Sequence, residues 1–452
     1  MLPRLRPRCY YDLVIEVAIV RPGPIQGDMV HPYLRRRNKE EEPFYFDKTI
    51  ERVLKRTLGV PLFQEQAMSL AVKAAGFTPG EADQLRWASG AWKARGNKLA
   101  EFGARILGGM VKRGYPSTFA EQVFEQIKGF SGYGFPENHA ASFALLVYAS
   151  SWLKKHRPAA FAAALINSQP MGFYQPAQIV RDAKEHGVEI RPIDVNHSRW
   201  DCTLEPTANG PAIRLGMRLV QGLSEAEAER IATHVAAHGC PANIAGLWRQ
   251  SRVNAASLRR LASADAFGSM NLSRQAALWA THSLNDEPLP LFDESLAASP
   301  CDEPAYLPKP TQAAQVAKDY RAVGLSLRPH PVSFIREALA VRGVIPNGQL
   351  ADEKLAPDKA CLTVAELVLV RQRPGTASGV VFMTIEDETG IANLVVWPKV
   401  YERFRAAVRH STAIVCMGQV QRAGEVVHVV ARRFERLSLG TVDGLSMSRD
   451  FH

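Results

Sequence analysis

The first part of the chain carries apolar residues at the three-to-four-residue spacing that is typical of amphipathic helices. Up to about residue 190 this spacing predicts helices over 118–128, 140–156 and 158–167. Ser117 is a candidate N-cap for the first of these helices, and a proline occupies the first turn of the last one. We therefore expect a mostly helical region here.

The pattern becomes less regular after residue 190. Residues 191–205 are expected to be extended, and short helices are expected to alternate with tight turns over 211–282. Residues 283–312 are rich in proline, aspartate and glutamate, which predicts a linker, and a helical stretch follows over 313–342.

A period of two replaces the helical period from about residue 360 to residue 437. Strands are expected over 364–370, 380–385, 391–397, 413–417 and 426–430. The turn from Asp387 to Gly390 joins the second and third strands as a hairpin. Five such strands fit an OB-type barrel. The predicted fold class is a multi-domain α+β protein with a helical first region, helical hairpins and a C-terminal five-stranded OB-type β-barrel.

The composition of the chain favours an anionic partner. The chain has 452 residues, enough for roughly three domains. Its net charge of +10 favours nucleic acid, although basic enzymes and membrane-surface proteins share such a charge. The six scattered cysteines include no C-x-x-C pair, so neither a zinc knuckle nor a redox motif is supported. No signal-type or membrane-spanning apolar run is present, which predicts a cytoplasmic protein without membrane contact.

The densest charge asymmetry lies at residues 86–113, which hold seven basic residues against one acid, Glu101. Asn97 is a candidate cap for a helix that carries cations every seven residues, at Lys98, Arg105 and Lys112. A neighbouring apolar stripe would face the core, at Leu99, Phe102, Ile106 and Met110. Such a ridge suits a nucleic-acid backbone. A solvated helix face explains it equally well.

Residues 132–139 (GYGFPENH) open the next helix with glycines that allow a ligand to approach the backbone closely. Asn138 is a candidate N-cap beside an electropositive helix start, and Tyr133 is placed to stack on a base or a sugar. A capped turn with two buried aromatic residues explains the segment about as well. His139, taken alone, is a structural hydrogen-bonding histidine.

Residues 215–224 have the order of apolar residues and glycines that a helix-hairpin-helix turn requires. Gly216 and Gly222 are its glycines, and Ser224 is a candidate N-cap of the following helix. Such a hairpin presents backbone amides to a DNA phosphate without reading sequence. A second helical pair is expected over 254–267. An ordinary helical hairpin remains the alternative.

Aromatic residues on the predicted barrel are candidates to stack on single-stranded bases. The candidates are Phe382, Trp397, Tyr401 and Phe404, several of which must instead fill the barrel interior.

Several longer motifs occur together and in a fixed order. They are RPGPIQG (21–27), FQEQ (63–66), GYGF (132–135), HAASF (139–143), NSQPMGFY (167–174), VVFMTIEDETG (380–390) and SRDFH (448–452). Together they resemble the bacterial C-family DNA polymerases, which are similar to the polymerase III alpha subunit. More narrowly, they resemble the error-prone branch that is used in translesion synthesis. The resemblance covers nearly the whole chain.

The resemblance implies a domain order. In that family a PHP domain and a palm domain precede the fingers, the tandem helix-hairpin-helix and the OB domain. This order implies fingers over 1–190, hairpins over 191–282, a linker with a helical segment over 283–355, an OB domain over 356–440 and a tail over 441–452. The family holds its catalytic Mg²⁺ on palm aspartates upstream of these residues. The chain alone is therefore expected to bind no metal, to contain no catalytic residue and to be inactive.

The resemblance also implies nucleotide contacts. Arg86, Lys93 and Arg95 would lie where fingers cations meet the incoming triphosphate, with Tyr133, Asn138 and His139 completing the predicted nucleotide site. The chain departs from the family at Trp87, Ser89 and Asp28, where Arg, Met and Gly are usual, and these departures argue against full activity. Residues 288–292 (PLPLF) occupy the place of a clamp-binding peptide but lack its leading glutamine, which favours a linker.

The resulting hypothesis is a C-terminal portion of an error-prone DNA polymerase, which performs DNA-templated nucleotidyl transfer during damage-induced mutagenesis. Its expected partners are primer-template DNA and deoxynucleoside triphosphates, with other mutagenesis proteins and the sliding clamp as indirect partners. The expected DNA contacts are Lys98, Arg105, Lys112, Gly216, Gly222, Phe382 and Trp397. The alternative is a non-catalytic DNA-binding scaffold that uses its hairpins and OB domain, for which Arg86 would not matter.

Overall fold

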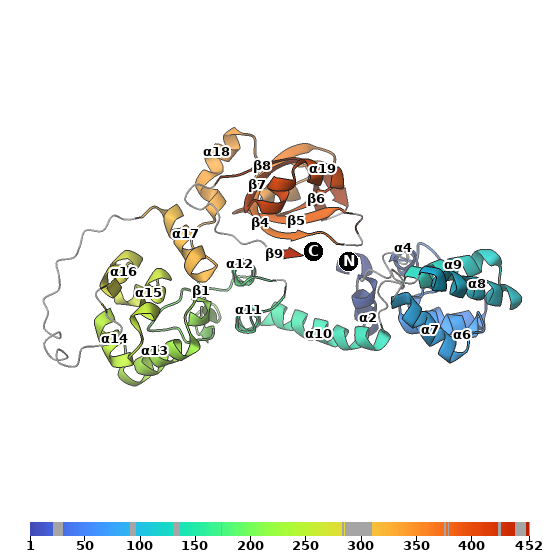
Figure 1. Ribbon diagram of the computed structural model, residues 1–452, viewed down its shortest axis with the longest axis horizontal. Helices are drawn as coiled ribbons and strands as arrows, with labels where there is room; N and C mark the ends of the chain where they lie inside the picture. The colour runs from blue at the N-terminus through green and yellow to red at the C-terminus, as the bar shows by residue number, and fades with distance from the viewer. Residues whose placement is uncertain are drawn as a thin grey trace. The chain divides into compact units, whose positions relative to one another are not determined.

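The chain forms two compact units, Met1–His156 and Arg157–His452, which we describe separately (Figure 1). The structure, a computed structural model, describes residues 1–20, 30–90, 96–129, 136–172, 174–282, 284, 310–374, 377, 379–423, 426–438 and 449–451. The RPGPIQG, GYGF and PLPLF segments and positions 28, 93, 95 and 133 lie outside these ranges.

Every regular element in the described residues of the first unit is a helix. Its elements are α1 (Leu2–Leu5), α2 (Tyr10–Ile19), α4 (Val30–Arg37), α5 (Lys48–Leu54), η1 (Lys55–Thr57), α6 (Gln64–Lys73), α7 (Pro79–Gly90), α8 (Gly96–Lys112), α9 (Ser117–Gly129) and α10 (Glu137–His156). The predicted apolar stripe on α8 is confirmed at three positions. Ile106 and Met110 are fully buried, and Phe102 packs against the same core.

Three predicted helix caps are wrong. Ser117 is the first residue of α9, and Asn97 and Asn138 lie inside the first turns of α8 and α10. The start of α10 is instead fixed by a tertiary contact, because the backbone amide of Glu137 donates to the Glu65 carboxylate on α6 at 3.0 Å. A partner so distant in sequence cannot be found from the local spacing of cap residues.

A buried ion pair braces the start of this unit. The guanidinium of Arg37 on α4 donates to both carboxylate oxygens of Asp12 on α2, at 2.7 and 2.6 Å. Burial alone would raise the pKa of Asp12, but the hydrogen bonds from Arg37 and from the amides of Arg8 and Cys9 hold it below its usual value. Two helices are thereby locked together by one bidentate contact.

The second unit begins with helices and a small sheet. Its elements before the barrel are α11 (Pro158–Asn167), α12 (Pro176–Glu185), β1 (Ile190–Arg191), β2 (Thr203–Glu205), β3 (Ala212–Arg214), η3 (Met217–Leu219), α13 (Glu225–His238), α14 (Ile244–Ser251), α15 (Ala255–Ser263), η4 (Gly268–Met270), α16 (Arg274–His282), α17 (Gln312–Val323), η7 (Pro331–Ile335), α18 (Arg336–Val341) and η8 (Asn347–Ala351). The central strand β3 pairs in parallel with β1 and antiparallel with β2. The helix over 158–167 has its predicted bounds. The segment 191–205 was predicted as extended, and its described backbone contains a turn between β1 and β2.

The second unit ends in the predicted five-stranded barrel. Its elements are β4 (Cys361–Gln372), β5 (Val381–Glu386), β6 (Ile391–Val396), α19 (Pro398–Arg403), α20 (Arg405–His410), β7 (Ala413–Ala423) and β8 (Val426–Arg436), and β9 (Arg449–Phe451) adds in parallel to β4. The strand order is β5-β6-β8-β7-β4, and β4 pairs with β5 to close the barrel. The hairpin between β5 and β6 is confirmed. Its turn is held by the Asp387 carboxylate, which accepts from the amides of Thr389 and Gly390.

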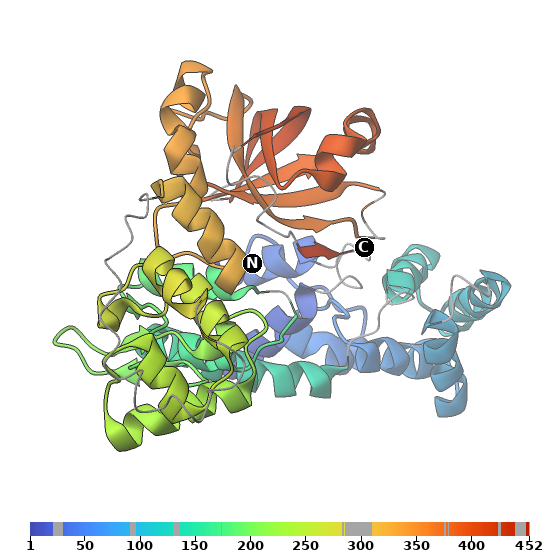
Figure 2. The ribbon, with the colours of Figure 1, turned by 60° about the vertical axis from the view of Figure 1, so that its left-hand side comes forward.

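Helix α17 links the hairpin region to the barrel. In both views it lies between the helices α15 and α16 and the barrel strands (Figure 1 and Figure 2). Val316 and Ala317 near its start belong to the same core as Leu367 and Val415 on the barrel strands. Val323 at its end packs against the core of the hairpin region. One helix therefore contributes to both cores.

Candidate nucleic-acid interface

The structure describes some of the predicted fingers cations and not others. Lys93 and Arg95 lie outside the described residues. Arg86 falls in α7 and Lys98 in α8, but their side chains are outside the description. Arg105 and Lys112 are described, and both are exposed on α8.

Arg105 already has an anionic partner in the protein. Its guanidinium pairs with the Glu81 carboxylate of α7 and lies over the Phe77 ring at 4.8 Å. Hydrogen bonds from the Thr78 backbone and from Arg105 lower the pKa of Glu81 to about 2, so this carboxylate is charged at neutral pH. The acid lies outside the 86–113 window, which is why the sequence pattern showed a cation ridge with a single acid. The middle cation of that ridge therefore stabilises the contact between two helices.

Asn138 and His139 are exposed on the first turn of α10. The His139 ring packs edge-on against Phe143, with 4.7 Å between the ring centroids. The neighbouring Glu137 carboxylate accepts from the Tyr11 hydroxyl at 2.7 Å and pairs with Arg56 at 3.2 Å. This end of α10 therefore presents two polar side chains next to an acid that already has partners.

The predicted hairpin occurs at the turn between η3 and α13. Ser224 is confirmed as the N-cap of α13, since its hydroxyl accepts from the Glu227 amide at 3.4 Å. Gly222 is exposed at the tip of the turn with φ +76°, a conformation that favours glycine. Gly216 is buried, and an added Cβ would lie 2.3 Å from the carbonyl oxygen of Trp200. The two glycines therefore differ: Gly222 forms the surface of the hairpin, whereas Gly216 allows it to pack.

A hollow lined by three arginines opens beside this turn. Its volume is about 280 Å³, and its lining residues are Gln221, Arg259, Arg260, Ser263, Arg321 and Ala322. We name it the arginine hollow. Arg259 and Arg260 come from α15 and Arg321 comes from α17. Within the described residues none of these three guanidinium groups has a carboxylate partner. Sequence reasoning did not single it out, because no motif spacing connects α15 with α17.

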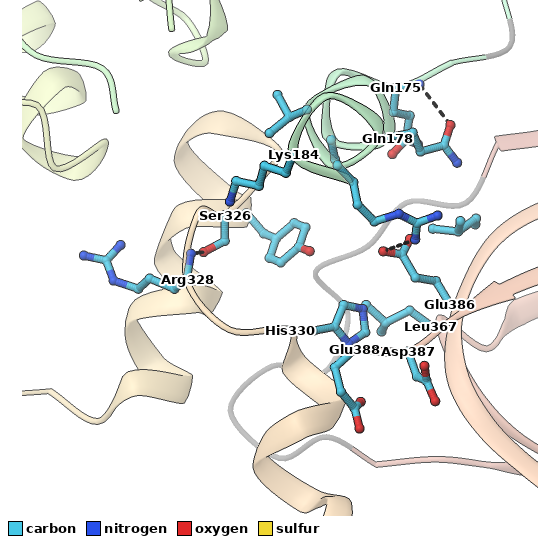
Figure 3. A pocket seen from close by; sticks show the side chains of 15 residues that line it. Gln175, Gln178, Lys184, Ser326, Arg328, His330, Leu367, Glu386, Asp387 and Glu388 are labelled. Carbon is cyan, nitrogen blue, oxygen red and sulfur yellow. Dashed lines mark hydrogen bonds and ion pairs between the residues drawn. The ribbon is translucent and has the colours of Figure 1, made fainter. Parts of the chain in front are cut away.

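A second cavity, of about 220 Å³, lies where α12, α17 and the barrel strands β4 and β5 meet (Figure 3). Both of its arginines are already paired with carboxylates. Arg181 lies 2.5 Å from Glu386, and Arg328 contacts Asp319 at 2.7 Å and Asp265 at 2.7 Å. We name this cavity the joint pocket, because paired charges suit a contact between domains better than a phosphate site.

The joint pocket also buries a histidine. Burial lowers the pKa of His330 to about 4, so its imidazole is neutral at physiological pH. Its Nδ1 accepts from the Val332 amide at 3.3 Å and thereby caps η7.

The barrel presents two of the four predicted aromatic residues. Phe382 on β5 is 39% exposed and Trp397 after β6 is 54% exposed, whereas Tyr401 is buried and Phe404 packs partly against the core. Phe382 lies opposite Val395 in the antiparallel pair, and Trp397 follows Val395 by two residues. Because side chains two residues apart share a face, Phe382 and Trp397 lie on the same outer face of β5 and β6. The second and third strands form the ligand face of OB folds.

Comparisons with known proteins agree with this geometry. Residues 1–114 match the bacterial DNA polymerase III alpha subunit finger domain, residues 187–277 a helix-hairpin-helix motif and residues 363–437 an OB-fold nucleic acid binding domain. "Error-prone DNA polymerase 2" of Rhizobium meliloti is 54% identical over 449 residues, which are 97% of this chain and 41% of that protein. The chain belongs to the C family of bacterial DNA polymerases. Two further relatives are "Error-prone DNA polymerase 1" of Agrobacterium fabrum, with 52% identity over 97% of this chain, and "Error-prone DNA polymerase" of Methylococcus capsulatus, with 50% identity over 100% of it.

The family resemblance deduced from the motifs is thereby confirmed. The chain spans about two fifths of the length of these polymerase relatives, with 41% and 44% of the second and third covered. In the described ranges no three His, Cys, Asp or Glu side chains gather closely enough to hold a metal ion. None of the described helices has the length and apolar character needed to cross a membrane.

Proposed function

We propose that this chain is the DNA-gripping and nucleotide-positioning portion of an error-prone DNA polymerase that acts in damage-induced translesion synthesis. The observation that carries the proposal is the exposed hairpin turn at Gly222, which lies beside an unpaired arginine hollow in the same unit as an OB barrel with exposed aromatic residues. A hairpin of this kind contacts duplex phosphates, and an OB face binds single strands. Primer-template DNA contains both kinds of structure.

Within this proposal the domain division is the one implied by the resemblance: fingers over 1–190, hairpins over 191–282, a linker with a helical segment over 283–355, an OB domain over 356–440 and a tail over 441–452. Arg86, Lys93 and Arg95 would neutralise charge on the triphosphate of an incoming nucleotide, beside Tyr133, Asn138 and His139. Lys98 and Lys112 would contact the DNA backbone.

The reaction itself needs clustered carboxylates that hold divalent ions near the primer hydroxyl. We propose that Mg²⁺ supplies this chemistry and that residues outside this chain bind it. The chain would then bind DNA without extending a primer. A cytoplasmic location and indirect contact with a sliding clamp and other mutagenesis proteins remain predictions of the same proposal.

Binding of the chain to primer-template DNA at increasing salt tests the first part. Fluorescence anisotropy should show an affinity that falls with salt, with a log–log slope of about −0.9 for each phosphate neutralised. An affinity that does not change with salt would overturn the DNA-gripping role. The same experiment with magnesium and nucleotides should show no primer extension, and extension by the purified chain would overturn the assignment of the metal site.

A chimera tests the polymerase role against a DNA-binding scaffold. The preceding three fifths of the Rhizobium meliloti relative would be fused to this chain, with and without Arg86→Ala. We expect the chimera to incorporate nucleotides and the Arg86→Ala chimera to lose incorporation while keeping DNA affinity. A folded chimera that binds DNA but incorporates no nucleotide would favour the scaffold.

A further inference from the structure

The backbone amides of the hairpin are mostly occupied inside the protein. The Gly216 amide donates to Cys202 Sγ at 3.3 Å, the Gln221 amide to the Ala322 carbonyl at 2.8 Å and the Leu223 amide to the Val220 carbonyl at 3.2 Å. The amides from 217 to 220 also donate to protein carbonyls. Over the described residues 216–223, only the Gly222 amide has no protein acceptor.

The helix start beyond the turn is also poorly suited to an anion. Glu225 and Glu227 both lie in the first turn of α13, where their carboxylates already complement the positive end of the helix. Glu227 further pairs with Arg230 at 2.9 Å and accepts from the Asn254 amide at 2.9 Å. A phosphate placed at this helix start would meet like charge.

The arginine hollow supplies the hydrogen-bond donors for a phosphate that the hairpin backbone does not have free. The Arg260 guanidinium lies against the hairpin tip, with its Nε 3.2 Å from the point where a Cβ on Gly222 would stand. Arg259 Nε is buried and has no acceptor in the part of the chain that the structure describes. Arg321 reaches the same hollow from α17. Three cations therefore line a space large enough for a phosphate group, and the hairpin tip at Gly222 lies against one of them.

We infer that this hairpin holds a phosphate through the side chains of Arg259, Arg260 and Arg321, with the Gly222 amide as the single backbone donor. The inference rests on the proposed function and assigns the phosphate to the DNA backbone. A free phosphate or a nucleotide polyphosphate has the same chemistry and is distinguished by experiment. Guanidinium groups suit this task because they donate two parallel hydrogen bonds to phosphate oxygens.

The site is assembled from distant parts of the chain. Arg321 is adjacent to Ala322, whose carbonyl accepts from the Gln221 amide, so docking of α17 onto the turn brings the third arginine into place. Helix α17 also packs against the barrel strands. The helix that supplies Arg321 to the phosphate site therefore also supports the OB domain.

The decisive variant is Arg260→Gln together with Arg321→Gln in the full chain. Arg259 is retained because its Nη2 donates to the Leu284 carbonyl at 3.1 Å and supports the fold. The matched control is Arg342→Gln with Arg433→Gln, which removes two positive charges from residues that pair with Glu435 on the barrel. Thermal unfolding of all three proteins verifies that the substitutions leave the fold intact.

For duplex DNA we expect the hollow variant to lose on the order of tenfold in affinity relative to the control, and its salt slope to fall by about two. Equal affinities and slopes in the two variants would overturn the inference, while salt-dependent binding by the unmodified chain would still support the proposed function. Competition with inorganic phosphate distinguishes a site for the DNA backbone from a site for free phosphate. A variant that loses phosphate binding but keeps full duplex affinity would overturn the assignment to DNA.

Discussion

The backbone amide of Gln221 donates a hydrogen bond to the carbonyl oxygen of Ala322 at 2.8 Å. This contact ties the tip of a helical hairpin to the end of α17, which follows residues 285–309 in the sequence. The start of the same helix packs under the barrel through Val316 and Ala317. The element expected to hold duplex DNA and the barrel expected to hold a single strand therefore share one supporting helix.

The exposed aromatic residues of the barrel predict an effect on single-stranded DNA. Phe382→Ala and Trp397→Ala should each weaken binding of a single-stranded oligonucleotide by about 1–3 kcal/mol, because each removes a surface on which a base stacks. Fluorescence titration gives the affinities. Trp279→Ala removes another exposed tryptophan, from α16, and serves as the control. Losses of the same size in all three variants would show that the barrel aromatics contribute no more to single-strand binding than an exposed tryptophan elsewhere.

The ion pair in the joint pocket predicts an asymmetric effect on stability. Arg181 has two carboxylate partners, Glu386 at 2.5 Å and Glu185 at 3.2 Å. Arg181→Ala leaves the largely buried Glu386 carboxylate without its cation, whereas Glu386→Ala leaves Arg181 with Glu185. We expect Arg181→Ala to lower the free energy of unfolding by about 2–3 kcal/mol and Glu386→Ala by less. Urea unfolding of the single and double variants measures both values, and a larger loss for Glu386→Ala would contradict this account.

His330 predicts a pH dependence of stability. Burial lowers its pKa to about 4 in the folded protein, whereas a histidine in an unfolded chain has a pKa of about 6.5. Between these values the unfolded chain binds a proton that the folded protein does not, so the free energy of unfolding falls as the pH decreases. From pH 7 to pH 5 the contribution of His330 should decrease by about 1–2 kcal/mol.

The substitution His330→Asn isolates this contribution, because asparagine can still cap η7 but does not titrate. Urea unfolding at pH 7 and pH 5 should show a smaller pH effect in this variant than in the unmodified chain. His410→Asn, at an exposed histidine, is the control and should keep the full effect. Identical pH profiles for the His330→Asn and His410→Asn proteins would rule out the buried histidine as the cause.

Glu366 predicts a stabilising substitution. Its side chain is wholly buried on β4, and burial raises the pKa of its carboxyl well above the usual value. For an acid with a raised pKa, the stability contribution is complete below the unfolded pKa and is lost as the pH rises. Glu366→Gln should therefore raise the free energy of unfolding at pH 8 by about 1 kcal/mol or more and change it little at pH 4.5. Chemical unfolding at both pH values tests this, with the exposed Glu402→Gln as control.

Much of the fold followed from local patterns. The period-two segments predicted all five barrel strands, although β4, β7 and β8 extend beyond the predicted ends. These strands continue because each pairs with neighbours on both sides, and such pairing supports residues whose own sequence does not alternate clearly. The caps at Asn97, Ser117 and Asn138 failed for the related reason that contacts from other helices, such as Glu65, determine where a helix starts.

The candidate site was predictable only in part. The order of glycines and apolar residues located the hairpin, and the cap at Ser224 was correct. That order could not show that Gly216 is buried while Gly222 is exposed, because burial depends on what packs against the turn. Charge counting along 86–113 likewise missed Glu81, which reaches Arg105 from a neighbouring helix.

The order of residues along the chain was enough to predict the family, the helical and barrel regions and the presence of a hairpin. The helical and barrel regions and the hairpin depend on the spacing of residues that are neighbours along the chain. The family follows from several long motifs that occur in a fixed order. Which charges are paired and which are free depends on the folded arrangement of the chain. Arg259, Arg260 and Arg321 become one site, and Arg181 meets Glu386, only because folding brings distant segments together, and no local spacing encodes those distances.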